Sequence, residues 1–201
     1  MIRVLLAEDQ GMMRGALATL LELEDDIEVV DLLGRGDEVV EACVRLTPDV
    51  AVLDIEMPGR SGLDAAAELS TAVPSCRVLI VTTFGRPGYL RRAMDAGARG
   101  FLIKDSPVEQ LADAIRRVVA GETVVDPTLA AAALRAGPNP LSARERDVLA
   151  ASADGATIAD VAAALHLSES TVRNYLSAAI GKTDARNRIE ALNVARTNGW
   201  L

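Results

Sequence analysis

Short apolar runs alternate with amphipathic segments through the first two thirds of the chain. An apolar run without polar alternation is typical of a strand buried on both faces, and apolar residues at helical spacing indicate helices that cover a sheet. The repeated order of strand and helix predicts an α/β flavodoxin-like (βα)5 domain whose parallel sheet has the order 2-1-3-4-5. We expect strands at 2–7, 27–33, 50–53, 78–82 and 100–103, and helices at 10–22, 37–46, 63–73, 88–96 and 108–120.

Carboxylates follow two strands that should be neighbours in this sheet. Glu8 and Asp9 end the first strand, and Asp54 ends the third. Because like charges at short distance repel one another, the cluster predicts a bound divalent cation, and Mg2+ suits carboxylate and phosphate oxygens best. Taken alone, Asp54 could instead cap the next segment, and Glu8 with Asp9 could cap the helix that follows them.

Polar residues also end the fourth and fifth strands. Thr82 ends the fourth and Lys104 the fifth, so both should lie at the sheet edge that holds Asp54. Taken singly, Thr82 is an ordinary strand residue and Lys104 a solvated charge. Together with Asp54 they provide a carboxylate nucleophile, a hydroxyl and an ammonium, which are the groups needed to accept a phosphoryl group and hold it as an acyl phosphate.

These motifs resemble the receiver domain of bacterial response regulators over residues 1–120. The resemblance rests on Glu8 and Asp9, Asp54 with Met57–Gly59, Thr82, and Lys104 with Asp105–Pro107. It implies that Asp54 is the phosphoacceptor, that Thr82 and Lys104 contact the phosphoryl group, and that Phe101 is a switch residue. It further implies a Mg2+ site made of Glu8, Asp9, Asp54 and the backbone carbonyl of Glu56, and an influence of Glu56 and Phe84 on the phosphoryl lifetime.

The helices expected at 10–22 and 108–120 carry more apolar residues than one buried face requires. Met13 in the first helix and Val119 in the second belong to this surplus. We expect the two helices to form a twofold receiver dimer that phosphorylation favours. The alternative is a wide apolar stripe that lies entirely inside the domain.

A second, all-α domain is expected after a linker. Residues 121–140 lose strand character, hold one alanine-rich helical segment at 126–135, and end in the turn-forming run Ala136–Pro140. We therefore predict a first domain at 1–120, a linker at 121–140 and a four-helix domain at 141–201. Its helices are expected at 143–153, 157–165, 169–180 and 187–198. Ser142, in capping-box spacing with Glu145, should cap the first helix, and Ser168 should cap the third.

The second and third of these helices have the form of a helix-turn-helix. The core-facing positions of the third helix are Val172, Leu176 and Ile180. Arg173, Asn174 and Ser177 should point outward, and Arg and Asn suit guanine and adenine edges in the major groove. Arg186 and Arg188 could contact phosphates, although a merely solvated polar face is the alternative.

The second domain is similar to the LuxR/NarL-type DNA-binding domain over residues 141–196. The similarity rests on Leu141–Leu149, Ala159–Ala162, Thr171–Tyr175 and Arg186–Ala191. It implies a DNA-contacting set of Thr171, Arg173, Asn174, Ser177, Arg186 and Arg188. Gly181 departs from the family pattern and predicts a weakened end of the third helix.

A narrower resemblance connects the chain to the DesR-type members of this family. It rests on Thr82–Tyr89, Val172–Tyr175 and Asn198–Trp200. It implies a DesK-like kinase that senses membrane fluidity as the partner, and lipid-desaturation genes as targets.

Composition sets the remaining expectations. The net charge is −8, yet residues 138–201 hold seven basic and seven acidic side chains, so charge alone does not predict a nucleic-acid partner. Cys43 and Cys76 have no metal-ligand spacing, and no apolar run reaches the length needed to cross a bilayer. We expect a reduced, cytoplasmic protein without membrane insertion.

These features together predict a DNA-binding transcriptional response regulator of a two-component system rather than an enzyme. A sensor histidine kinase would phosphorylate Asp54, the receiver domains would associate as a homodimer, and paired helix-turn-helix domains would bind double-stranded DNA. One alternative is an aspartate-nucleophile phosphohydrolase, which would share Asp54 and Mg2+ but would turn over small phosphate esters. The other is an orphan regulator that binds DNA without phosphorylation.

Overall fold

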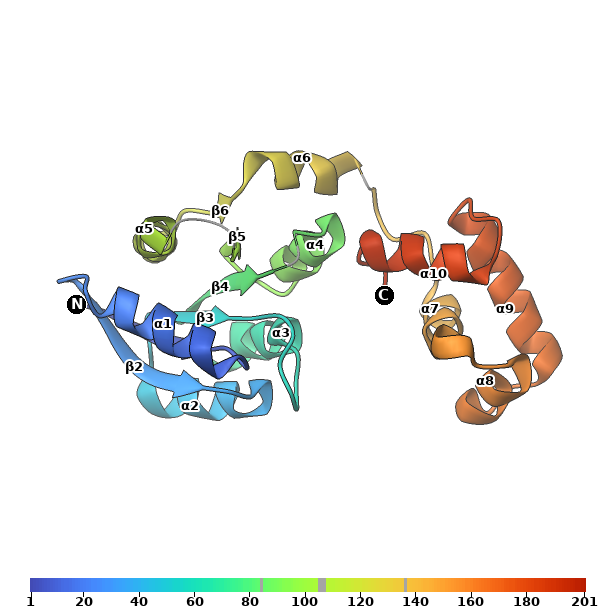
Figure 1. Ribbon diagram of the computed structural model, residues 1–201, viewed down its shortest axis with the longest axis horizontal. Helices are drawn as coiled ribbons and strands as arrows, with labels where there is room; N and C mark the ends of the chain where they lie inside the picture. The colour runs from blue at the N-terminus through green and yellow to red at the C-terminus, as the bar shows by residue number, and fades with distance from the viewer. Residues whose placement is uncertain (84, 105–107, 136) are drawn as a thin grey trace. The chain divides into compact units, whose positions relative to one another are not determined.

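The computed structural model describes residues 1–83, 85–104, 108–135 and 137–201 (Figure 1). The predictions for Phe84, for the motif Asp105–Pro107 and for Ala136 lie outside the described residues. The chain divides into two compact units, built mainly from residues 1–130 and 131–201, and each is described separately. Among the described residues, none of the helices combines the length and apolarity that crossing a bilayer requires.

The first unit is built on a parallel sheet with the strand order β2-β1-β3-β4-β5-β6. The strands are β1 (Ile2–Ala7), β2 (Ile27–Leu33), β3 (Val50–Leu53), β4 (Arg77–Thr82), β5 (Gly100–Ile103) and β6 (Val124–Val125). The predicted order of the first five strands is confirmed. The prediction that strand character is lost after residue 120 is wrong, because β6 pairs with Gly100 and Phe101. Two residues are too few to show a periodicity in the sequence.

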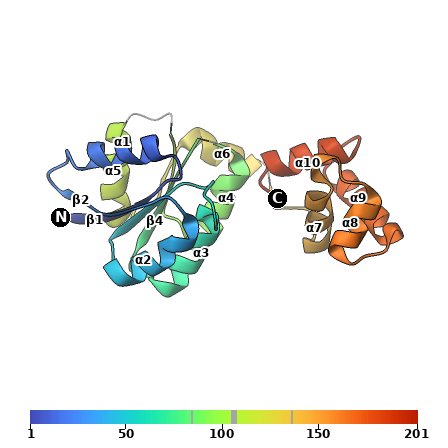
Figure 2. The same cartoon turned by 60° about the horizontal axis from the view of Figure 1, so that its bottom comes forward.

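Helices cover both faces of this sheet, as expected for parallel strands buried on each side. They are α1 (Gly11–Leu21), the 3-10 turn η1 (Gly36–Glu38), α2 (Val39–Leu46), α3 (Gly62–Ala72), α4 (Pro87–Asp95) and α5 (Val108–Val119). Figure 2 shows α1 and α5 on one face, and α2 and α3 on the other. Val4 and Leu6 of β1 point to the α1 and α5 face, where they pack with Leu17 and Ile115.

The second unit is a small helical bundle. The helices that follow the sheet are α6 (Pro127–Arg135), α7 (Ala143–Ala151), the 3-10 turn η2 (Ala153–Gly155), α8 (Ile158–Leu165), α9 (Glu169–Lys182) and α10 (Arg188–Thr197). His166 adopts a left-handed conformation (φ 52°) in the turn between α8 and α9. The α9 helix continues through Gly181, two residues beyond its predicted end. The centre of the core of this second unit is formed by Val148, Val172 and Ala191.

Candidate functional site

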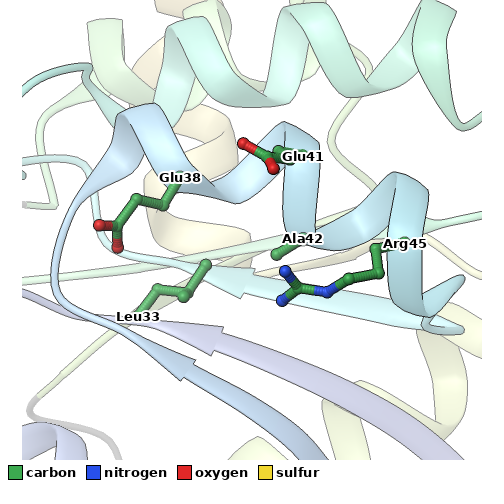
Figure 3. Close-up of a pocket in the computed structure, with 5 residues that line it drawn as sticks. All are labelled: Leu33, Glu38, Glu41, Ala42 and Arg45. Atoms are coloured by element: carbon green, nitrogen blue, oxygen red, sulfur yellow. The ribbon is translucent and has the colours of Figure 1, made fainter.

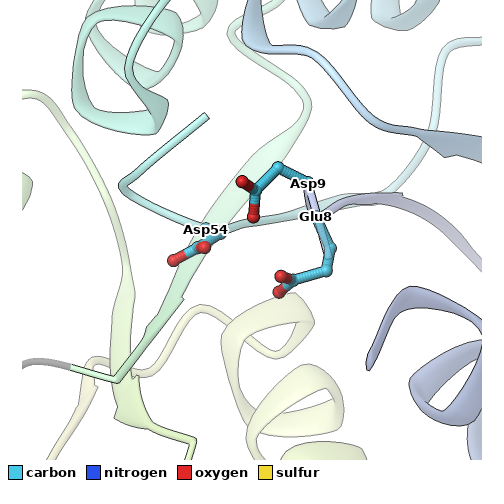
Figure 4. Close-up of side chains that lie close together, drawn as sticks. All are labelled: Glu8, Asp9 and Asp54. Atoms are coloured by element: carbon cyan, nitrogen blue, oxygen red, sulfur yellow. The ribbon is translucent and has the colours of Figure 1, made fainter. Parts of the chain in front are cut away.

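The register of β1 against β3 brings the predicted carboxylates together at the carboxyl ends of the strands. Ala7 is the partner of Leu53, and the Asp54 N–H donates to the Ala7 carbonyl oxygen at 2.9 Å. Carboxylate oxygens of Glu8, Asp9 and Asp54 therefore lie within 4.8 Å of one another (Figure 4). Glu8 and Asp54 are buried and Asp9 is exposed, so the cluster is open to solvent on one side.

Lys104 completes this cluster from the end of β5. Its Nζ lies 2.6 Å from Glu8 Oε2 and 2.9 Å from Asp54 Oδ2, and its side chain is 4% exposed. Burial disfavours the charged ammonium, but the ion pairs with Glu8 and Asp54 outweigh it and raise the pKa of Lys104 above its ordinary value. Three carboxylates and one ammonium leave two negative charges, which a divalent cation would neutralise.

The other predicted receiver residues lie on the neighbouring strands or in the adjoining loop. Thr82 is buried at the end of β4, and its carbonyl oxygen accepts the Lys104 N–H at 2.8 Å. Phe101 is fully buried on β5. The Glu56 side chain is exposed in the loop after Asp54. These positions are those expected from the sequence, whereas the roles assigned to the residues stay predictions.

Two contacts that hold the site were missed by reasoning from the sequence. Arg14 on α1 donates from Nη1 to the Glu8 carbonyl oxygen at 2.6 Å. Gly62 donates its N–H to the Ile55 carbonyl oxygen at 3.0 Å, and a Cβ added at Gly62 would lie 2.9 Å from the carbonyl carbon of Asp54. The sequence predicted a helix from residue 63, but not this close approach to the strand end.

A pocket of about 240 Å³ lies between β2 and α2 (Figure 3). It is lined by Leu33, Glu38, Glu41, Ala42 and Arg45. None of the predicted site residues lines it, and its side chains carry charges of both signs. The carboxyl ends of the strands therefore remain the candidate site in this unit.

The outward face of α9 carries the residues predicted to contact DNA. Arg173, Asn174 and Ser177 are exposed, while Val172 and Leu176 are buried, as their helical spacing predicted. Ile180 and Thr171 are half-buried, so they belong to the border between the core and the exposed face. The helix thus presents polar side chains that can reach base edges.

The arginines of this surface contact other groups of the same unit. Arg173 Nη2 donates to Glu169 Oε2 at 2.7 Å. Arg186 donates from Nε and Nη2 to the two carboxylate oxygens of Glu190 at 3.0 and 3.1 Å, an arrangement that lowers the pKa of Glu190. Half-buried Arg188 donates from Nη1 to the Ala156 carbonyl oxygen at 2.9 Å. Each DNA contact predicted for these three arginines would therefore compete with a partner inside the unit.

A buried carboxylate connects α7 to the end of α9. Glu145 Oε2 accepts the Ser142 N–H at 2.6 Å and Lys182 Nζ at 2.7 Å. The ammonium, followed by the Ser142 N–H, holds the pKa of Glu145 below its usual range. The sequence predicted the contact between Ser142 and Glu145, since serine and glutamate have capping-box spacing, but the partner 37 residues away was missed.

Comparison with known families identifies the class of protein that these two sites define. The model described as "Response regulator receiver domain" matches residues 4–116. The model described as "Bacterial regulatory proteins, luxR family" matches residues 139–195. A receiver joined to such a domain is a DNA-binding regulator of a two-component system. The chain belongs to the LuxR family of response regulators.

Relatives and solved structures agree with this assignment. The chain is 47% identical to the uncharacterized transcriptional regulatory protein YvfU and 46% identical to the transcriptional regulatory protein DesR, both of Bacillus subtilis (strain 168), over the full length of each pair. The crystal structure of the response regulator ChrA of a heme-sensing two-component system is 33% identical, with a TM-score of 0.59 over 100% of this chain and 98% of that one. An RcsB–DNA complex, 22% identical with a TM-score of 0.68 over 98% of both chains, shows the same fold.

Family membership sets the general chemistry of the acidic cluster. Receiver domains generally bind Mg2+ at an acidic site, and the oxygen donors of Glu8, Asp9 and Asp54 fit a hard divalent cation. Response regulators act with sensor histidine kinases and DNA, and they are in general regulators rather than enzymes. The narrower resemblance to DesR-type regulators is likewise confirmed by the full-length identity to DesR.

Proposed function

We propose that a sensor histidine kinase transfers a phosphoryl group to Asp54 and that this modification controls DNA binding. The observation that carries the proposal is the buried Asp54 carboxylate, which lies 2.9 Å from Lys104 Nζ beside Glu8 and Asp9. An Asp54 carboxylate oxygen attacks the phosphorus, and the phosphohistidine nitrogen of the kinase leaves. The product is an acyl phosphate with more negative charge than the carboxylate had, which Lys104 is placed to pair with.

Mg2+, held by Glu8, Asp9, Asp54 and the Glu56 carbonyl, would supply charge neutralisation at the phosphoryl oxygens. Thr82, at the end of the neighbouring strand, would donate its hydroxyl to the phosphoryl group. Phe101, fully buried on β5, would change position with Thr82 and carry the change to the receiver surface. Glu56 would influence how long the phosphoryl group persists.

We propose that phosphorylated receivers pair through α1 and α5. Met12 is 91% exposed, and Leu20 and Val119 are also exposed, which supports an apolar contact surface on these helices. Met13 packs partly into the core, so Met12 and Val119 are the better positions for substitution. Met12→Glu with Val119→Glu should abolish donor-dependent dimerisation while Asp54 is still phosphorylated.

The second domain would then bind DNA as a pair. In this proposal Thr171, Arg173, Asn174 and Ser177 face the major groove, and Arg186 and Arg188 contact phosphates. The domains are proposed to span 1–120 and 141–201, with a connecting segment at 121–140 whose first part adds β6 to the receiver sheet. The protein would act in the cytoplasm, where the chromosome lies. The 46% identity to DesR supports a DesK-like kinase and lipid-desaturation genes as the specific pathway.

The experiment that tests this function compares the native chain with Asp54→Ala and with Asp25→Ala, a control at an exposed carboxylate. Molar mass in solution and affinity for duplex DNA are measured with Mg2+, with and without a small phosphodonor. The proposal expects the phosphodonor to raise both the molar mass and the DNA affinity of the native chain and of Asp25→Ala, and to raise neither for Asp54→Ala. Equal DNA binding by all three under every condition would favour the orphan regulator, and turnover of phosphate esters would favour the phosphohydrolase.

A further inference from the structure

Glu169 and Arg173 form an ion pair on the exposed face of the recognition helix α9. Arg173 Nη2 lies 2.7 Å from Glu169 Oε2, and the two side chains are 57% and 52% exposed. Exposed pairs four residues apart contribute little to the stability of a helix. The pair therefore contributes little to the stability of α9. It lies on the surface that the proposed function assigns to DNA binding.

The position of Glu169 matters for the approach of DNA. Glu169 is the first residue of α9, directly after the capping residue Ser168. In helix-turn-helix proteins the first residues of the recognition helix lie closest to the groove. A carboxylate there repels backbone phosphates, and it also competes with them for the guanidinium of Arg173.

We propose that Glu169 is a specificity-determining residue that acts through Arg173. This inference rests on the proposed contact between Arg173 and DNA. Glu169 accepts one of the five guanidinium N–H groups and so withholds Arg173 from the phosphates of arbitrary DNA. The remaining N–H groups of the planar guanidinium still match O6 and N7 of a guanine. On a correct base pair Arg173 can therefore bind guanine while it keeps its ion pair with Glu169, whereas a phosphate of a wrong sequence must compete with Glu169 for the guanidinium.

Glu190 provides a comparison within the same unit. It also pairs with an arginine, Arg186, but through both carboxylate oxygens, and it additionally accepts the Arg186 backbone N–H at 2.7 Å. Glu190 therefore orders the start of α10 and faces a residue proposed to contact phosphates alone. Replacement of Glu190 by Gln should strengthen binding to all DNA sequences equally. Replacement of Glu169 by Gln should strengthen binding to non-cognate sequences more than binding to the cognate one.

The test uses the full-length chain, treated with a small phosphodonor, and two fluorescent duplexes of equal length. One duplex is selected from a random pool by the native chain, and the other has the same bases in scrambled order. Glu169→Gln should tighten binding to the scrambled duplex about twofold and steepen its salt dependence by about one counterion, so the ratio of the two affinities falls. Asp147→Asn, which removes the same charge from α7, controls for the change in net charge.

A double-mutant cycle with Arg173→Gln decides whether Glu169 acts through Arg173. The proposal expects Glu169→Gln to lose its effect on the affinity ratio when Arg173 is already replaced. Two results would overturn the role of Glu169 while leaving the DNA contact of Arg173 intact, provided that Arg173→Gln weakens binding. In the first, Glu169→Gln changes the affinity ratio no more than Asp147→Asn does. In the second, Glu169→Gln changes the ratio equally well when Arg173 is already replaced by Gln. If Arg173→Gln weakens neither duplex, the DNA contact itself is wrong, and the role of Glu169 with it.

Discussion

Gly62 allows the start of α3 to pack against the backbone of the candidate phosphoacceptor, and alanine at this position should disturb the site. A Cβ at Gly62 would lie 2.9 Å from the Asp54 carbonyl carbon and still closer to its oxygen. Nonbonded carbon atoms pack at about 3.5–4 Å, so the strand end or the helix must shift by about 1 Å. Overpacking of this kind costs about 1–3 kcal/mol, which corresponds to a fall in melting temperature of roughly 5–10 °C.

The same shift would misplace the Asp54 carboxylate. Misplacement of a reacting group by about 1 Å can slow a reaction by about a hundredfold, so Gly62→Ala should also reduce the rate of phosphorylation by a small phosphodonor. Thermal unfolding and the time course of phosphoprotein formation measure the two effects. Gly15→Ala is the matched control, because a Cβ at Gly15 on α1 meets no atom within 4 Å. Wild-type stability and rate in Gly62→Ala would refute the argument from close packing.

Three further changes have outcomes that follow from burial and charge. Phe101→Ala removes a fully buried ring and should lower the free energy of unfolding by about 3–5 kcal/mol in urea denaturation. Because the pKa of Glu145 is lowered, its stabilising effect is fully present above the ordinary value of 4.5 and is lost as pH falls through the lower folded value. Lys182→Met should cost about 1–2 kcal/mol at neutral pH, a figure discounted for the 43% exposure of Lys182, and should flatten the fall in stability below pH 4.5. Arg116→Ala breaks ion pairs with the half-buried carboxylates of Asp26 and Glu24, which solvent still reaches, so its effect on melting temperature should shrink as salt is added.

The acidic cluster was predictable because strand register turns positions in sequence into positions in space. Once the apolar runs gave the strand order, Glu8 and Asp54 had to meet at the ends of neighbouring strands. Lys104 could likewise be assigned to this edge of the sheet, because all strands of a parallel sheet end at the same edge. The starts of α7 and of the recognition helix α9 were predictable for a local reason, since serine caps and helical spacing specify where they begin.

The contacts that the sequence did not reveal depend on tertiary distance rather than on local pattern. Lys182 reaches Glu145 only because α9 crosses α7 at its far end, and nothing in the spacing of these residues encodes that crossing. The approach of Gly62 to Asp54 depends in the same way on the path of the loop between β3 and α3. The pairing of Glu169 with Arg173 has a spacing of four and could have been predicted, but that spacing is so common on helix surfaces that it carries little information by itself.

The charge balance of the second domain gives a physical reason why its DNA binding should depend on pairing. Residues 138–201 hold equal numbers of basic and acidic side chains, and Arg173 and Arg186 are both paired with carboxylates of the same unit. A single domain would therefore gain little from counterion release and should bind any one DNA site weakly. In the proposed mechanism, a receiver dimer places the second domain at high effective concentration beside the second half-site, so a modest association between receivers can determine whether the promoter is occupied.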